Sequence, residues 1–173
     1  MKSVTITTAV LAIACAFGQG TKSANSQAMF AGMYKQAEMM FSTKNVQGLQ
    51  SIMTPNYTET DMGRTMNGKE SAAGLQQFLS MFKTLHCHFV MHSVKVSGNT
   101  AVTTDTGHMW GTSTMIDSKT KKPHRLTAQR DDTMTWTMVK GHWMVSKIVG
   151  SNDKMTMDGK PFNPMTMMPK KGK

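Results

Sequence analysis

Hydrophobic side chains recur at every third or fourth position in the first half of the chain and at every second position in the second half. The first spacing predicts an amphipathic helix over residues 25–43 and a shorter one over residues 45–53, which Pro55 ends. A brief alternating stretch at residues 57–61 indicates a strand, and residues 70–82 return to helical spacing. We therefore expect three helices and one short strand in this half.

The second half alternates with a period of two and is divided by turn-forming pairs such as Gly98-Asn99. This pattern predicts four long strands, at residues 86–97, 100–115, 126–139 and 142–149. Helices that precede a run of strands favour an α+β fold, in which three N-terminal helices pack on a strongly curved antiparallel sheet. We expect one domain over residues 25–150 and a mobile, Met- and Lys-rich tail over residues 151–173.

The first residues have the pattern of a secretory signal. Lys2 precedes an uncharged, mostly apolar run, and residues 16–18 fit a signal-peptidase site. The run is too short for a transmembrane helix, which needs about 20 apolar residues. We predict that residues 1–18 are a signal peptide and that the mature protein is secreted or periplasmic. Alternatively, residues 12–15 resemble a lipoprotein cleavage box, which would anchor the chain by a lipid at Cys15.

Composition and charge exclude several classes of protein. The 173 residues are 39% hydrophobic and 17% charged, which is too apolar and too weakly charged for a disordered chain. The formal charge is +10, and its cations gather at residues 116–124 and in the tail. Apart from Phe162, these stretches lack the interleaved aromatic residues on which single-stranded nucleic acids stack. We therefore expect no nucleic-acid partner, while attraction to an anionic envelope surface stays an open alternative.

Three sequence motifs occur in an order that resembles a known superfamily. Residues 57–61 followed by residues 67–70 resemble its strand, turn and helix start, and residues 96–102 resemble its hairpin. Residues 130–136 followed by residues 140–145 resemble its closing pair of strands. This is the nuclear transport factor 2-like (cystatin-roll) superfamily, and the motifs resemble its polyketide-cyclase (SnoaL)-like branch of secreted bacterial proteins.

The resemblance implies a cone-shaped roll with a largely apolar pocket between helices and sheet, and a homodimer that packs sheet to sheet. The superfamily includes isomerases, cyclases, dehydratases, transport factors and binding modules, so the fold alone leaves the activity open. We expect the protein to bind a small, apolar or partly polar molecule, with no cofactor. The first alternative is an enzyme of the isomerase, cyclase or dehydratase kind.

Alternation along the strands identifies side chains that could reach such a pocket. The candidate ligand-binding residues are Tyr57, Trp110, Arg130, Met134 and Trp136. The candidate catalytic residues are Asp61, His108 and Asp132, because in the isomerase relatives an aspartate base acts beside a hydrogen-bond donor. Burial raises the pKa of a carboxyl and a nearby Arg lowers it, so either aspartate could be tuned as the base. The opposing interpretation is structural: an Arg130–Asp132 ion pair, and tryptophans that fill the core or a dimer contact.

A copper site is the second alternative. Methionine is unusually common, with 20 residues against six leucines, and Cu(I) prefers soft thioether ligands. His86 and His88 share a strand face, while His92 lies about 13 Å further along. The candidate copper ligands are His86, His88, Met155, Met157, Met165 and Met167. The opposing interpretation is that Met replaces Leu throughout the chain and that Cys87, the only thiol left after signal cleavage, is a small apolar filler.

Overall fold

The computed structural model describes residues 24–163, which form three helices and seven strands. The helices are α1 (Ala24–Ser42), α2 (Val46–Ser51) and α3 (Gly68–Ser80). The strands are β1 (Met53–Asp61), β2 (Arg64–Asn67), β3 (Phe82–Ser97), β4 (Thr100–Ile116), β5 (Pro123–Val139), β6 (His142–Met157) and β7 (Lys160–Pro161). The three predicted helices and the α+β class are confirmed.

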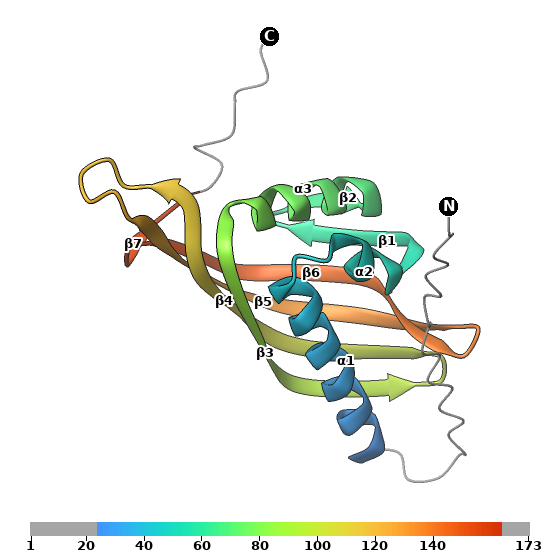
Figure 1. Ribbon diagram of the computed structural model, residues 1–173. Coiled ribbons are helices and arrows are strands. Elements are labelled where there is room, and N and C mark those ends of the chain that lie inside the picture. Colours follow the sequence, from blue (N-terminus) through green and yellow to red (C-terminus); the bar gives the residue numbers. More distant parts are fainter. Residues whose placement is uncertain (1–23, 164–173) are drawn as a thin grey trace, which may run out of the picture.

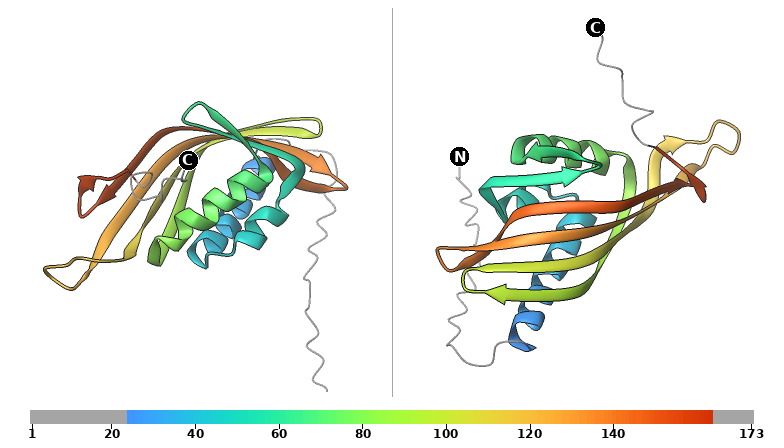
Figure 2. Two further views of the ribbon diagram at one scale, coloured as in Figure 1. Left: turned by 90° about the horizontal axis from the view of Figure 1, so that it is seen from above. Right: turned by 180° about the vertical axis from the view of Figure 1, so that it is seen from behind.

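The strands form one curved sheet, and all three helices lie against its concave side (Figures 1 and 2). The strand order is β2-β1-β6-β5-β4-β3, with β7 paired to β6. We call the concave side the inner face and the convex side the outer face. No helix among residues 24–163 covers the outer face, as the view from behind in Figure 2 shows. The predicted roll of N-terminal helices on a curved sheet is confirmed.

The sheet is antiparallel, as predicted, at every strand pairing but one, which makes it a mixed sheet. β1 pairs antiparallel with β2 but parallel with β6, which follows it by some 80 residues of chain. Pro55 lies inside β1 and does not precede a loop. The β1–β6 register shifts between Met53 and Thr58, so Pro55, which has no N–H, occupies the irregular part of the strand.

The domain boundary predicted at residue 150 is too early, because β6 continues to Met157. Gly150 and Asn152 resemble strand breakers in the sequence, and Asn152 does adopt a positive φ of 56°. The β5–β6 ladder shifts register here and then resumes, with Met155 opposite Ala128 and Met157 opposite Leu126. Residues 164–173 of the predicted tail and the predicted signal peptide lie outside the described residues.

Two apolar clusters fill the space between the helices and the inner face. The larger surrounds Phe30 of α1 and Trp136 of β5, whose ring centroids are 5.3 Å apart. The smaller joins Leu79 of α3 to Phe82 and Leu126. Burying such side chains supplies about 1.5–3 kcal/mol each, which orders the helices on the sheet. Between residues 24 and 163, no helix is both long enough and apolar enough to cross a membrane.

Candidate functional site

Ionisable side chains interrupt the apolar packing of the inner face. One guanidinium and five carboxyl groups from β1, β4, β5 and β6 form a group that we call the inner cluster: Glu59, Asp61, Asp105, Arg130, Asp132 and Asp153. Strand alternation points these side chains inward and their chain neighbours outward. The sheet order brings together groups as distant in sequence as Glu59 and Arg130, which are 71 positions apart.

Arg130 is the centre of the inner cluster. Its Nε donates a hydrogen bond to Asp132 at 2.7 Å, and its Nη1 donates one to Glu59 at 2.8 Å. Its Nε also lies 3.9 Å from a carboxyl oxygen of Asp153. Burial lowers the pKa of Arg130, but the surrounding carboxylates outweigh that effect and the net shift of its pKa is upward. The guanidinium therefore stays charged and neutralises part of the acidic cluster.

Two carboxyl groups of the cluster face each other across neighbouring strands. Asp105 of β4 lies directly opposite Asp132 of β5 in the ladder. Burial raises the pKa of Asp132 to about 7, although the charge of Arg130 opposes the shift. Burial likewise raises the pKa of Asp105 to about 6, against a hydrogen bond from Tyr34. Like charges directly opposite one another are unfavourable, so the pair holds a proton for part of the time near neutral pH.

A chain of buried hydrogen bonds fixes one side of Asp105. Tyr34 of α1 donates its hydroxyl hydrogen to Asp105 Oδ2 at 2.7 Å and lies 2.7 Å from Thr103 Oγ1. Because a tyrosine has one hydroxyl hydrogen, Thr103 is the donor to Tyr34. Trp136 Nε1 in turn donates to Thr103 Oγ1 at 2.9 Å. Burial raises the pKa of Tyr34, so the phenol stays protonated and holds Asp105 in place.

The β1 side of the cluster is held from two directions. Glu59 accepts hydrogen bonds from Ser71 of α3 and from the Tyr57 hydroxyl. Burial raises the pKa of Tyr57, which keeps the phenol a donor. Burial, together with a hydrogen bond to the neighbouring Asp61, raises the pKa of Asp153. Asp153 therefore holds a proton for part of the time near neutral pH.

Exposure falls steadily from the β6 side of the cluster to its β4 side. The side chains of Asp153, Arg130 and Asp132 are 31%, 20% and 10% exposed, and Asp105 is 1% exposed. Within the described residues, three buried atoms of the cluster have no hydrogen-bond partner: Asp61 Oδ1, Asp105 Oδ1 and Arg130 Nη2. Buried polar atoms nearly always have a partner. Three such atoms in one cluster are therefore unusual.

Gly150 makes the position of Arg130 possible. It lies against the guanidinium, and a Cβ built on Gly150 would overlap the Nε, Nη2 and Cζ atoms of Arg130. A larger residue would have to displace the centre of the cluster. The sequence shows this glycine only as a strand breaker, so its role beside Arg130 was not predicted.

Six of the predicted site residues meet on the inner face, and two do not. Tyr57, Asp61, Arg130, Asp132, Met134 and Trp136 lie in or beside the inner cluster. His108 lies on the other face of β4, opposite Gln129 and His88, so the expected pairing of His108 with Asp61 or Asp132 is not present. Trp110 also lies on the outer face, where it stacks on His86.

The error on β4 has a simple cause. Alternation alone gives two faces for each strand but not which of them lies beside a given face of the next strand. The observed β4–β5 register places Asp105, and not His108, against Asp132. Asp105 was therefore missed, and so were Glu59 and Asp153, which reach the cluster through the pairing of β1 with β6 and of β6 with β5. The signal that could have found Asp105 is the register set by Thr100 opposite Thr137.

The candidate copper ligands are separated by the sheet. His86 stacks on Trp110, and His88 Nδ1 lies 2.8 Å from Glu38 on α1. Met155 and Met157 pack into the smaller apolar cluster on the inner face, while Met165 and Met167 lie outside the described residues. The described residues include no group of three His, Cys, Asp or Glu side chains suited to a metal ion. Copper binding stays a prediction.

Cys87 is a buried free thiol of the larger apolar cluster. Burial raises its pKa to about 12, so the thiol is protonated and unreactive at neutral pH. The expected filler position on a strand is therefore what the structure shows.

Comparison with known proteins identifies the fold. A putative dehydratase from the NTF2-like family of Streptomyces avermitilis superimposes with a TM-score of 0.60 at 14% identity, over 73% of this chain and 96% of that one. An NTF2-like protein of unknown function from Shewanella oneidensis gives 0.57 at 12% identity, over 73% and 99%. This chain has a nuclear transport factor 2-like fold.

Enzymes are also among the proteins with this fold. The hexachlorocyclohexane dehydrochlorinase LinA-type3 from Novosphingobium barchaimii gives a TM-score of 0.57 at 17% identity, over 84% of this chain and 95% of that one. No family model matches the chain, and no curated protein matches it. At these identities the likeness establishes the fold, and any function must be argued from the site.

Proposed function

We propose that this NTF2-like domain binds a small, partly polar molecule at the inner cluster. The observation that carries the proposal is the set of three buried, unpartnered atoms on Asp61, Asp105 and Arg130. A ligand that accepts a hydrogen bond from Arg130 Nη2 and donates to the two carboxyl oxygens would satisfy all three. The surrounding apolar clusters would contact the rest of the molecule.

The route to this site is suggested by the gradient of exposure. The ligand would enter beside Asp153, the most exposed side chain of this gradient, and its polar end would reach toward Asp132 and Asp105. Ligands whose polar group fits both Arg130 and the carboxyl groups would therefore be preferred over purely apolar ones.

Native mass spectrometry of protein purified without denaturation from its own host tests this proposal. We expect a bound non-protein mass in the natural protein, and its loss in Asp132→Asn. Asp131→Asn is the matched control, because Asp131 adjoins Asp132 but bonds to Thr106 and Asn152 on the outer face. Absence of any bound mass, or equal retention by both variants, would contradict binding at the inner cluster.

A second candidate function is proton-transfer catalysis, and the raised pKa of Asp132 favours it. A base whose pKa lies near 7 both accepts and releases protons at neutral pH. Asp132 would take a proton from a substrate carbon, the C–H electron pair would form a double bond, and a leaving group would depart from the adjacent carbon. Arg130 Nη2 would stabilise negative charge on the substrate.

Elimination is the reaction to test, because a putative dehydratase and a dehydrochlorinase share the fold. Purified protein would be incubated with β-hydroxy carbonyl compounds and chlorinated cyclohexanes, and products identified by gas chromatography and mass spectrometry. Catalysis predicts turnover that rises through about pH 7 and disappears in Asp132→Asn but not in Asp131→Asn. Ligand binding without turnover would support the binding role alone.

We also propose that the protein is exported and forms a sheet-to-sheet homodimer. The apolar run and the small residues Ala16 and Gly18 support export, and the N-terminal sequence of the mature protein should begin after Gly18. Exposed Val102 and Val149 on the outer face support self-association. Sedimentation equilibrium would give twice the mass of one chain. A mature chain that begins at Met1 contradicts export, and a monomer contradicts the dimer.

A further inference from the structure

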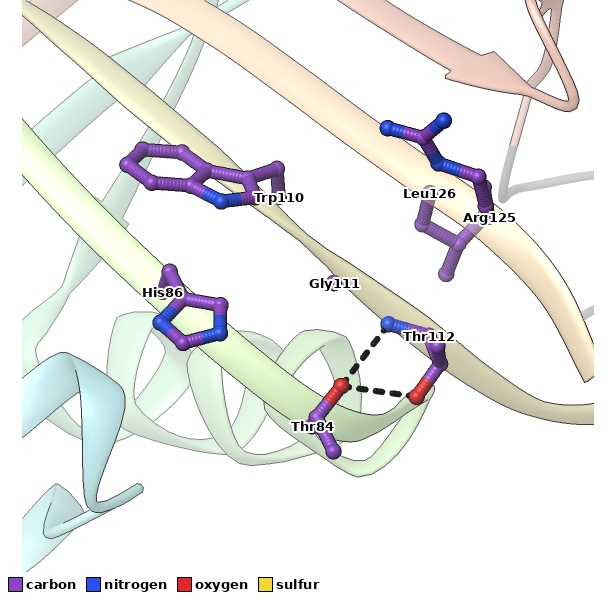
Figure 3. Close-up of a pocket in the computed structure, with 7 residues that line it drawn as sticks. All are labelled: Thr84, His86, Trp110, Gly111, Thr112, Arg125 and Leu126. Atoms are coloured by element: carbon purple, nitrogen blue, oxygen red, sulfur yellow. Dashed lines mark hydrogen bonds between the residues drawn. The ribbon is translucent and has the colours of Figure 1, made fainter.

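The outer face carries a hollow that the inner cluster does not explain. Its volume is about 260 Å³, and its lining residues come from β3, β4 and β5: Thr84, His86, Trp110, Gly111, Thr112, Arg125 and Leu126. Figure 3 shows His86 and Trp110 on one side of this hollow and Arg125 with the two threonines on the other. The sheet lies between this hollow and the inner cluster, so the two are separate sites.

The strand register explains why these side chains gather. His86 lies opposite Trp110, and Thr84 lies opposite Thr112, which in turn lies opposite Arg125. Gly111 between Trp110 and Thr112 has no side chain, and a Cβ there would overlap the backbone carbonyl of Thr84. The close approach of β3 and β4 at this glycine forms the floor of the hollow.

One side of the hollow is a flat aromatic surface. The His86 and Trp110 rings stack with centroids 5.7 Å apart and an interplanar angle of 22°. Trp110 is nevertheless 42% exposed, a large apolar area for a residue in the middle of a strand. A planar ring placed on this surface would cover the exposed indole face and gain stacking energy.

The other side of the hollow is suited to an anion. Among residues 24–163 the Arg125 guanidinium has no ion pair, although its backbone N–H donates to Asp158. Thr84 and Thr112 share one hydroxyl hydrogen bond of 2.7 Å, and Thr84 Oγ1 accepts from the Thr112 N–H. Two hydroxyl groups have two hydrogens, so one remains free to donate. An arginine and a free hydroxyl together match a carboxylate.

The charge around this end of the sheet favours the same ligand. The β4–β5 loop holds Lys119, Lys121 and Lys122 beside Arg125, and the nearby carboxylates are Asp117 and Asp158. These four positive and two negative side chains leave a net charge of +2, counted without His124. Such a patch attracts small anions.

We infer that this hollow is a binding site for a small planar aromatic carboxylate. The ring stacks on Trp110 and His86, and the carboxylate bonds to Arg125 and to the free hydroxyl of the Thr84–Thr112 pair. Neither part of the site suffices alone, because the aromatic surface is open to solvent and the arginine is exposed. The combination gives selectivity over both neutral aromatic molecules and simple inorganic anions.

The test follows the three tryptophan indole N–H signals of ¹⁵N-labelled protein by NMR while 2-naphthoate is added. We expect the Trp110 signal, assigned with Trp110→Phe, to shift and saturate, while that of buried Trp136 stays in place. Arg125→Gln should weaken the affinity about tenfold or more, because a charged hydrogen-bonded pair is lost. The affinity of the natural protein for the neutral 2-naphthamide should be as low as the affinity of Arg125→Gln for 2-naphthoate.

Two controls make the outcome specific. Lys147→Gln removes a positive charge from the outer face of β6, away from the hollow, and should leave the affinity unchanged. Asp132→Asn alters only the inner cluster and should also leave the affinity for 2-naphthoate unchanged. Failure of this inference is therefore distinguishable from failure of the proposed function. An unmoved Trp110 signal, equal binding of naphthoate and naphthamide, or full affinity in folded Arg125→Gln would each overturn the inference.

Discussion

Asp131 and Asp132 are adjacent in the chain, and their carboxyl groups lie on opposite faces of β5. Asp131 on the outer face accepts hydrogen bonds from Asn152 and Thr106, and these bonds lower its pKa. Asp132 on the inner face makes a stronger contact with Arg130, yet burial raises its pKa to about 7. Two identical side chains in one strand thus have opposite acid–base behaviour.

This comparison shows that solvent access, more than the nearest charged partner, determines how the pKa values of carboxyl groups differ between the two faces of the sheet. On the inner face the desolvation of several carboxyl groups exceeds what one guanidinium can offset. On the outer face, water and hydrogen-bond donors stabilise the ionised form. Each prediction below therefore changes an inner residue and compares it with a matched outer or unconstrained residue.

Removing Arg130 should have the largest effect. Arg130→Met leaves buried carboxylates without a counter-charge, so we expect a loss of about 3–5 kcal/mol in the free energy of unfolding at pH 7. Part of the loss should be recovered at pH 5, where Asp105 and Asp132 are mostly protonated. Arg125→Met on the outer face should change stability by about 0.5 kcal/mol or less. Urea unfolding at both pH values measures this, and equal effects of the two variants would contradict the comparison.

The two central tryptophans provide the next contrast. Trp136 is 3% exposed and donates to Thr103, so Trp136→Ala should cost about 3–5 kcal/mol. Trp110 on the outer face is 42% exposed, so Trp110→Ala should cost about 1 kcal/mol or less. Chemical unfolding measures both values. Similar losses would show that Trp110 itself is covered in solution.

A single added methyl group should disturb the inner cluster. Gly150→Ala places a Cβ where Arg130 now lies, so we expect a loss of about 1–3 kcal/mol. Gly74→Ala on α3 is the control, because the new methyl group would meet no atom within 4 Å apart from its chain neighbours and the backbone of its own helix, and alanine favours helix by about 1 kcal/mol. Thermal unfolding should therefore shift in opposite directions for the two variants. A neutral Gly150→Ala would mean that Arg130 is not confined there.

The smallest effect concerns pH. Folded Asp132 holds its proton up to about pH 7, while the unfolded chain releases it near pH 4. The folded state binds more protons in this interval, so stability should fall as pH rises from 4 to 7. We expect a melting temperature lower by about 3–6 °C at pH 8 than at pH 5. Asp132→Asn should reduce this difference and Asp131→Asn should not. A melting temperature that rises over the same interval would contradict the raised pKa.

The sequence predicted the architecture more completely than the site. Period-two alternation in residues 126–139 correctly placed Arg130, Asp132, Met134 and Trp136 on one face. It could not align that face with β4, because register depends on the turn and on packing, and so His108 was paired with Asp132 in error. The parallel pairing of β1 with β6 likewise brings Glu59 to Arg130. This pairing joins strands that are far apart in the chain, so no local sequence pattern predicts it.

The most direct test of this account is a ¹³C NMR titration of the aspartate carboxyl carbons, assigned with Asp132→Asn and Asp131→Asn. The account predicts a midpoint near pH 7 for Asp132 and one below the ordinary aspartate range for Asp131. If both carboxyl groups instead titrate together near pH 4, the inner cluster is not desolvated and the proposed site is contradicted.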